Sequence, residues 1–240
     1  MTEGREPGSP VPAAAPAAAA RDPRAQPAPP RLVLATGNPA KLAELARILA
    51  AAGVRAELAS LSDFPAAPSV RETGATFAEN ALLKARAAAA FTNLPAVADD
   101  SGLCVDALNG MPGVLSARWA GRHGDDAANL GLVLGQLADV PDERRGAQFR
   151  CAAVLVLPSG GEHVREGAVH GRLSRAPRGS GGFGYDPVFV PAAAELAAVG
   201  LTGADGLTTA EMSPGDKDRI SHRGKALRAL VPVIASALGS

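Results

Sequence analysis

The composition of the chain changes abruptly at residue 31, and the pattern that begins there constrains the fold more than any other feature. Residues 32–35 form a short apolar run that is typical of a buried parallel strand. Residues 36–39 (Thr-Gly-Asn-Pro) interrupt the run, and leucines then recur at helical spacing from Lys41 to Ala52, before Gly53. A strand, a tight turn and a helix in this order indicate an α/β protein.

The rest of the folded chain continues this alternation. Residues 76–91 are rich in Ala and Leu and contain no helix breaker, which predicts a helix. The apolar run 149–157 predicts a buried strand, with 162–169 as its antiparallel neighbour. The other expected elements are strands at 54–58, 94–98 and 186–190, a helix at 125–138, and a closing helix with the apolar stripe Leu227, Leu230, Val231 and Ile234. This order predicts an α/β fold with a mixed sheet flanked by helices.

Residues 1–30 differ from everything that follows. They contain eight prolines and many alanines but few large apolar side chains. Such a composition cannot bury enough apolar surface to fold, so we predict a disordered tail. Residues 31–240 are then expected to form one domain.

Charge and cysteine content exclude several classes of protein. The 24 basic residues balance the 24 acidic ones, which argues against nucleic acid or an acidic membrane as a partner. No apolar run is long enough to span a bilayer. Cys104 and Cys151 lie far apart in apolar surroundings, and we interpret them as buried thiols of a protein from the reducing cytoplasm.

Two adjacent carboxylates, Asp99 and Asp100, follow the predicted strand 94–98. Neighbouring side chains of a strand point to opposite faces, so one of the two is expected to face a cleft and the other the scaffold. Carboxylates at the end of a buried strand often serve metal or phosphate chemistry in α/β proteins. The alternative is a simple turn, because Asp-Ser-Gly is good turn composition.

The turn from Thr36 to Lys41 has the features of a phosphate site. Gly37 allows a tight turn, Pro39 suits a first helical turn, and the free N–H groups of a helix start attract anions. Lys41 adds a positive charge. The segment lacks the spacing of the common P-loop, so an ordinary strand–helix turn remains the alternative.

A second glycine-rich loop spans residues 177–184. Its glycines match G-x-G-x-x-G formally, but no strand precedes them and no helix follows, so we reject a dinucleotide site. The loop presents Phe183, which could stack on a nucleobase or pack against the core. Further polar candidates are Asn80 and Lys84, one helical turn apart, where solvent exposure is the simpler expectation for Lys84.

Five motifs, taken together and in this order, resemble the inosine/xanthosine triphosphate pyrophosphatases, which hydrolyse non-standard purine nucleoside triphosphates. The resemblance runs from about Leu32 to Leu230. Each motif is modest alone, but five in order are highly specific. The motifs cover residues 35–41 (ATGNPAK), 72–80 (ETGATFAEN), 98–103 (ADDSGL), 182–187 (GFGYDP) and 221–226 (SHRGKA).

The resemblance implies roles for individual residues. Asp100 matches the catalytic and Mg²⁺-binding carboxylate, and Glu72 matches a second acidic residue near that metal. The implied substrate contacts are Thr36, Gly37, Asn38, Pro39, Ala40, Lys41, Ser101, Phe183, Gly184, Tyr185, Asp186, Lys217, His222 and Arg223. The resemblance also implies a homodimer with a long central sheet and an active-site cleft between two lobes.

These roles give a consistent mechanism. Mg²⁺ and the lysines neutralise the triphosphate, and a carboxylate removes a proton from the water that attacks the α-phosphorus. Whether Asp99 or Asp100 is that base stays open. Donors from His222 or Arg223 suit the 6-keto group of hypoxanthine and xanthine, whereas adenine has an amine there. Two alternatives remain: a pyrophosphatase for pyrimidine or other modified nucleotides, and a non-catalytic nucleotide sensor.

Overall fold

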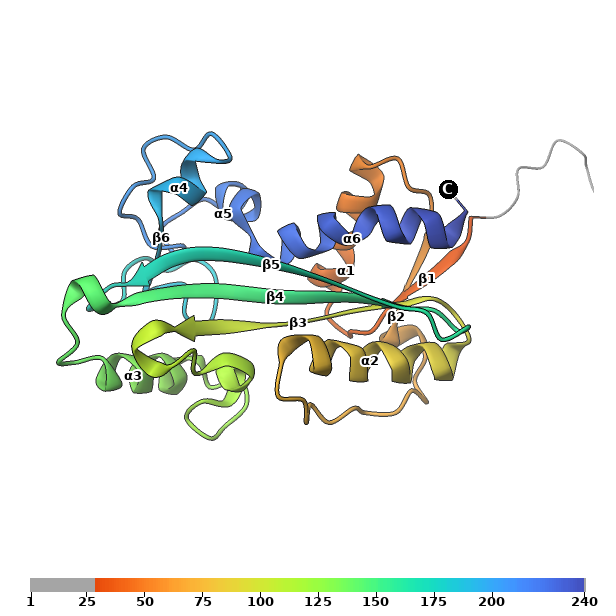
Figure 1. Ribbon diagram of the computed structural model, residues 1–240, viewed down its shortest axis with the longest axis horizontal. Helices are drawn as coiled ribbons and strands as arrows, with labels where there is room; N and C mark the ends of the chain where they lie inside the picture. The colour runs from red at the N-terminus through yellow and green to blue at the C-terminus, as the bar shows by residue number, and fades with distance from the viewer. Residues whose placement is uncertain (1–28, 240) are drawn as a thin grey trace, which may run out of the picture.

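A six-stranded mixed sheet forms the centre of the protein (Figure 1), in a computed structural model that describes residues 29–239. The sheet order is β2-β1-β3-β4-β5-β6. β1 pairs in parallel with β2 and β3, and the later pairings are antiparallel. The strands are β1 (Arg31–Leu34), β2 (Glu57–Ser60), β3 (Ala96–Val105), β4 (Gly146–Val156), β5 (Glu162–Leu173) and β6 (Phe189–Pro191). The predicted mixed α/β sheet is confirmed.

The α-helices of the described residues flank this sheet. They are α1 (Pro39–Ala51), α2 (Phe77–Thr92), α3 (Asp126–Gln136), α4 (Ala193–Ala197), α5 (Pro214–Ile220) and α6 (His222–Leu238). The first two of these helices begin at capping residues of the sequence. Asn38 caps α1 by accepting a hydrogen bond from the N–H of Ala40, and Thr76 caps α2 through the N–H of Glu79. None of these helices is both long and apolar enough to cross a bilayer.

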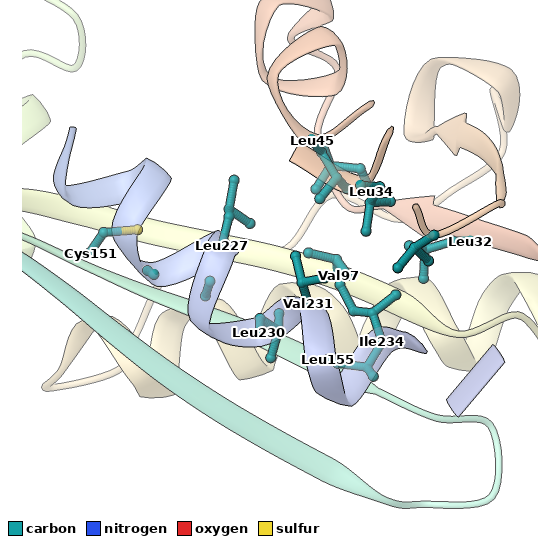
Figure 2. Packing of buried hydrophobic residues seen from close by; sticks show 14 residues of the cluster. Leu32, Leu34, Leu45, Val97, Cys151, Leu155, Leu227, Leu230, Val231 and Ile234 are labelled. Atoms are coloured by element: carbon teal, nitrogen blue, oxygen red, sulfur yellow. The ribbon is translucent and has the colours of Figure 1, made fainter. Parts of the chain in front are cut away.

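Helices α1 and α6 pack on one face of the sheet, and α2 covers the other (Figure 1). Figure 2 shows Leu45 of α1 beside Leu34 of β1, and Val231 of α6 beside Val97 of β3, within one hydrophobic cluster. Burying one such leucine side chain contributes about 1.5–3 kcal/mol to stability. On the opposite face, alanines of α2 pack against strand residues, which allows the helix to lie close to the sheet.

A second core forms at the other end of the long strands. It joins Leu103 of β3, Val133 of α3 and Leu196 of α4 around Phe189. The sheet therefore joins two lobes, one around β1, β2 and α1, the other around β6, α3 and α4 (Figure 1). The polar residues 99–101 of β3 lie between the stretches of this strand that enter the two cores.

The prediction that a strand ends before Asp99 is wrong, and so is the alternative of a turn. β3 continues through Asp99, Asp100 and Ser101, because β4 pairs with it residue by residue from Ala96 to Val105. The partner strand satisfies the backbone groups of the polar stretch, so tertiary pairing overrides turn-forming composition. The two carboxylates therefore lie in the middle of a strand.

Other expectations have mixed outcomes. Residues 186–188 form turns, and strand β6 begins only at Phe189. Cys104 and Cys151 are buried free thiols, as predicted. The first 28 residues of the predicted tail lie outside the described residues.

Candidate functional site

The two adjacent aspartates of β3 point to opposite faces of the sheet, as strand alternation predicts. Asp99 faces Lys41 of α1 and Arg223 of α6. Asp100 faces Asn80 and Lys84 of α2. The candidate site therefore has two polar clusters, one on each side of β3, and the peptide link between the aspartates joins them.

On the α2 face, two carboxylates approach the same ammonium group. Lys84 Nζ lies 2.9 Å from Glu72 Oε1 and 3.4 Å from Asp100 Oδ1. Asn80 Nδ2 donates to Asp100 Oδ2 at 3.1 Å. Arg118 adds a second cation, 3.6 Å from Glu72 Oε2. The structure thus brings the two acidic residues Glu72 and Asp100, far apart in sequence, to one point.

The surroundings shift the pKa values of Glu72 and Asp100 in opposite directions. Burial, reinforced by the negative charge of Glu72, raises the pKa of Asp100 above its ordinary value despite Lys84 and Asn80. Burial also acts on Glu72, but the hydrogen bond and charge of Lys84, together with Arg118 and His123, hold the pKa of Glu72 below its ordinary value. Asp100 is therefore the better proton acceptor of the pair.

On the other face, Asp99 is buried and paired with two cations. Lys41 Nζ donates to Asp99 Oδ2 at 2.7 Å, and Arg223 Nε lies 3.2 Å from the same oxygen. Arg223 also forms an ion pair with Glu44 and donates to the carbonyl of Lys41 at 3.3 Å. Despite burial, Lys41 and Arg223 hold the pKa of Asp99 below its ordinary value. This carboxylate stays ionised and joins α1 to α6.

His222 stands beside this cluster at the first position of α6. Its ring stacks on Phe149 of β4, with ring centroids 5.1 Å apart and planes inclined by 13°. Burial lowers the pKa of His222 to about 4, against the opposing charges of Asp186 and Asp99. The imidazole is therefore neutral at physiological pH and can donate one ring N–H.

The turn from Thr36 to Lys41 joins β1 to α1 as predicted. Thr36 Oγ1 accepts from the N–H of Asn38 at 3.1 Å, and Asn38 caps the helix that Pro39 begins. Gly37, Asn38, Pro39 and Ala40 are exposed. The backbone of this loop is therefore exposed at the start of α1. The Lys41 side chain extends from the first turn of α1 to Asp99 in the middle of β3.

The glycine-rich loop exposes one aromatic ring. Phe183 is 78 % exposed, which excludes the alternative that it packs in the core. Lys217 Nζ lies 4.9 Å from the centre of the ring and forms an ion pair with Asp186. Gly182 has φ +75°, and a Cβ there would lie 2.9 Å from Lys217 Nζ and collide with the Asp186 carboxylate. Glycine is therefore required for this loop to pack around Asp186.

The remaining predicted contacts hold the site together. Asp186 is buried and accepts hydrogen bonds from the N–H of Phe183 at 2.8 Å and from Thr209 Oγ1 at 2.8 Å. Tyr185 is buried, and its hydroxyl donates to the carbonyl of Ser116. Gly184 donates its N–H to Asp126 Oδ2 at 2.8 Å. Ser101 is half-buried beside Asp100. Direct contact of these residues with a substrate stays a prediction.

Sequence reasoning missed several members of the site. The expectation that Lys84 faces solvent is wrong: its side chain is 19 % exposed and pairs with both carboxylates. Asn80 is fully buried. A signal was available, because Asn80 and Lys84 lie one turn apart on α2. No sequence pattern marks Glu44 or Arg118 as a member of the site.

On the α2 face, the carboxylates of Glu72 and Asp100 converge on Lys84. Within residues 29–239, no group of three or more His, Cys, Asp or Glu side chains is placed to hold a metal ion. Two oxygen ligands suit Mg²⁺, which usually binds through one or two carboxylates and completes its coordination with substrate phosphates and water. The donor set therefore fits Mg²⁺ bound together with a phosphorylated substrate.

Comparison with known proteins identifies close relatives of this chain. The chain is 57 % identical over 209 residues to a dITP/XTP pyrophosphatase of Streptomyces coelicolor, covering 87 % of this chain and 99 % of the relative. A protein of the same name from Nocardia farcinica is 56 % identical over 207 residues, which cover 86 % of this chain and 95 % of the relative.

Solved structures agree in fold. The crystal structure of a dITP/XTP pyrophosphatase from Mycobacterium abscessus is 55 % identical, with a TM-score of 0.69, and the match covers 84 % of this chain and 99 % of that one. A HAM1 protein from Coxiella burnetii is 39 % identical, with a TM-score of 0.75 over 86 % of this chain and 99 % of that one. The Ham1 family profile matches residues 32–233, and the chain belongs to the Ham1 family.

Proposed function

We propose that this protein is a nucleoside triphosphate pyrophosphatase that hydrolyses non-standard purine nucleotides such as dITP, ITP and XTP. The products are the nucleoside monophosphate and pyrophosphate. The observation that carries the proposal is the convergence of Glu72 and Asp100 on one cation, Lys84. The names of the similar proteins from Streptomyces and Nocardia supply the substrate class.

The triphosphate carries about four negative charges that must be neutralised before water can attack. Lys41, Lys84 and Lys217 all lie on elements that border the aspartates or the exposed Phe183. The N-terminus of α1, behind the exposed loop 36–40, adds its helix dipole. In this proposal, substrate phosphates compete with Asp99, Glu72 and Asp186 for these three ammonium groups.

Glu72 and Asp100 are the residues that would hold Mg²⁺. When bound, the ion supplies charge neutralisation at the phosphates and lowers the pKa of water. Lys84 between the two carboxylates marks a position that already stabilises a positive charge. Lys84, which lies within reach of both carboxylates, would be available to bind a substrate phosphate.

Asp100 is the general base in this proposal, and Asp99 is not. Asp100 has a raised pKa, and its side chain is 13 % exposed, so water can reach it. Asp99 has a lowered pKa, a 2 % exposed side chain, and two cations on one of its oxygens. A base that accepts a proton from water needs both access and basicity. Attack at the α-phosphorus then expels pyrophosphate.

The nucleobase would be selected by stacking on an aromatic ring and by one hydrogen bond. The exposed Phe183 ring, with Lys217 beside it, can stack on a purine. The neutral His222 donates to a 6-keto oxygen, as in hypoxanthine and xanthine, whereas the 6-amine of adenine would leave the donor unpaired. Such a mismatch at a buried polar group can discriminate by about four orders of magnitude.

A release assay for pyrophosphate over a nucleotide panel tests the function. We expect turnover of dITP, ITP and XTP with Mg²⁺, at least about a hundredfold above ATP, dTTP and dUTP. Treatment with EDTA should abolish turnover, and added Mg²⁺ should restore it. Preference for a pyrimidine nucleotide would favour the pyrimidine alternative, and metal-independent binding without turnover would favour a nucleotide sensor.

We further propose that the enzyme is a cytoplasmic homodimer that binds neither nucleic acid nor membrane. The balanced charge and the two buried free thiols support this proposal. Light scattering after size-exclusion chromatography tests the dimer, with one molar mass near twice the 24.1 kDa of the chain as the expected result. A single peak at the monomer mass across micromolar concentrations would contradict it.

A further inference from the structure

The first turn of α6 carries His222 and Arg223, and it lies unusually close to β5. A Cβ on Gly167 of β5 would lie 2.6 Å from the N–H nitrogen of Ala226 and collide with the carbonyl of His222. Contacts this short do not occur between real side chains and backbone, so the helix start rests directly on the strand. The position of His222 therefore depends on how α6 is held on β5.

A partly buried ion pair holds this helix start. Lys225 of α6 forms an ion pair with Glu195 of α4 and donates to the carbonyl of Ala168 of β5 at 3.0 Å. Glu195 in turn accepts from the backbone N–H of His170 at 3.0 Å, and its carboxylate lies 3.0 Å from His170 Nδ1. Its side chain is only 14 % exposed. Three elements thus meet at one carboxylate.

The pair also connects the two lobes. Leu196, next to Glu195, is part of the core around Phe189, whereas Leu227 and Leu230 of α6 belong to the core around Leu34. Lys225 and the hydrogen bonds from His170 keep the pKa of Glu195 below its ordinary value despite burial. The carboxylate is therefore ionised and able to hold the ammonium group at neutral pH.

We propose that Glu195 and Lys225 are positioning residues, which fix the first turn of α6 so that His222 and Arg223 are aligned with the nucleobase. We call them the Glu195–Lys225 clamp. This inference rests on the proposed function. The clamp acts through the helix start and touches no reacting atom, so its loss affects recognition of the base more than the chemical step.

The substitutions Glu195→Gln and Lys225→Met each remove one charge at nearly constant volume. We expect KM for dITP to rise about fivefold in each variant, with kcat within about twofold of wild type. The double variant should resemble the single ones, because both changes break one interaction. Lys225→Arg keeps the positive charge and should retain most of the wild-type affinity.

Glu162→Gln is the matched control. Glu162 is the first residue of β5, five residues before Gly167, and it pairs with Arg86 of α2 at 2.6 Å. Its loss should leave KM unchanged. If Glu162→Gln raises KM as much as Glu195→Gln, the effect is a general one on β5 and the clamp proposal fails.

A measurement without nucleotide separates the clamp from the proposed function. The protein has four histidines, so the ring signals can be resolved by NMR and assigned with His222→Gln. Stacking on Phe149 should shift the His222 ring protons upfield in the wild type, and both clamp variants should reduce this shift. Unchanged His222 signals in folded clamp variants overturn the clamp, even if the enzyme is active. A changed signal in a protein that hydrolyses no nucleotide leaves the clamp intact and overturns the function.

Discussion

Asp99 and Asp100 are neighbours in the chain, but their surroundings differ on the two faces of β3. Asp99 meets two cations, is almost completely buried and has a lowered pKa. Asp100 shares one ammonium with Glu72, is partly accessible and has a raised pKa. Asp99 therefore joins helices α1 and α6 on one face, whereas Asp100 on the other face stays accessible to water. Four experiments test this difference between the two faces.

The largest expected effect concerns the face of Asp100. Asp100→Asn removes the proton acceptor and one oxygen ligand, and we expect kcat to fall at least about a thousandfold. Thermal unfolding should change little, because Asn can still accept from Asn80. Pyrophosphate release and calorimetry measure the two quantities. Activity near that of wild type would exclude Asp100 as the base.

Asp99→Asn should show the opposite behaviour. It leaves the charges of Lys41 and Arg223 without their buried partner, and we expect the free energy of unfolding to fall by about 2–4 kcal/mol. The control Asp142→Asn breaks the exposed pair with Arg175, and should lose less than about 1 kcal/mol. Urea titrations measure both. Equal losses in the two variants would remove the structural role assigned to Asp99.

His222, on the same face as Asp99, should make the folded protein less stable at acidic pH. The folded pKa of His222 is about 4, below the 6.5 of the unfolded chain, so the unfolded state takes up the proton first as the pH falls. We expect the free energy of unfolding to decrease by roughly 1–3 kcal/mol between pH 6.5 and pH 4 from this group. His222→Gln should flatten that part of the stability profile, and the same slope in both proteins would count against burial of a neutral imidazole.

The smallest effect tests whether Phe183 lies on the nucleobase. Phe183→Ala removes an exposed stacking surface, and we expect KM for dITP to rise about tenfold with little change in unfolding free energy. Phe91→Ala, on the other exposed phenylalanine of the described residues, is the matched control and should leave KM unchanged. An unchanged KM in Phe183→Ala would exclude stacking.

Much of the fold follows from local sequence. The run 32–35, the capped helix after Asn38 and the Ala-rich α2 each have their own signal, and the structure forms all three. The strand through Asp99 and Asp100 has no such signal, because Asp-Ser-Gly favours a turn. Only the pairing with β4 makes this stretch a strand. Local propensity therefore fails at the stretch where we propose that the chemistry takes place.

The α/β class of the chain, the opposite directions of Asp99 and Asp100, and the loop and helix start after β1 all follow from the amino-acid sequence. These features depend on interactions between residues that are close in the sequence, so they can be predicted from it. Folding places Lys84 near both Glu72 and Asp100, brings Lys225 to Glu195, and raises the pKa of Asp100 while it lowers that of Asp99. Burial and charge act through space, so they depend on residues that the chain brings together only when it folds.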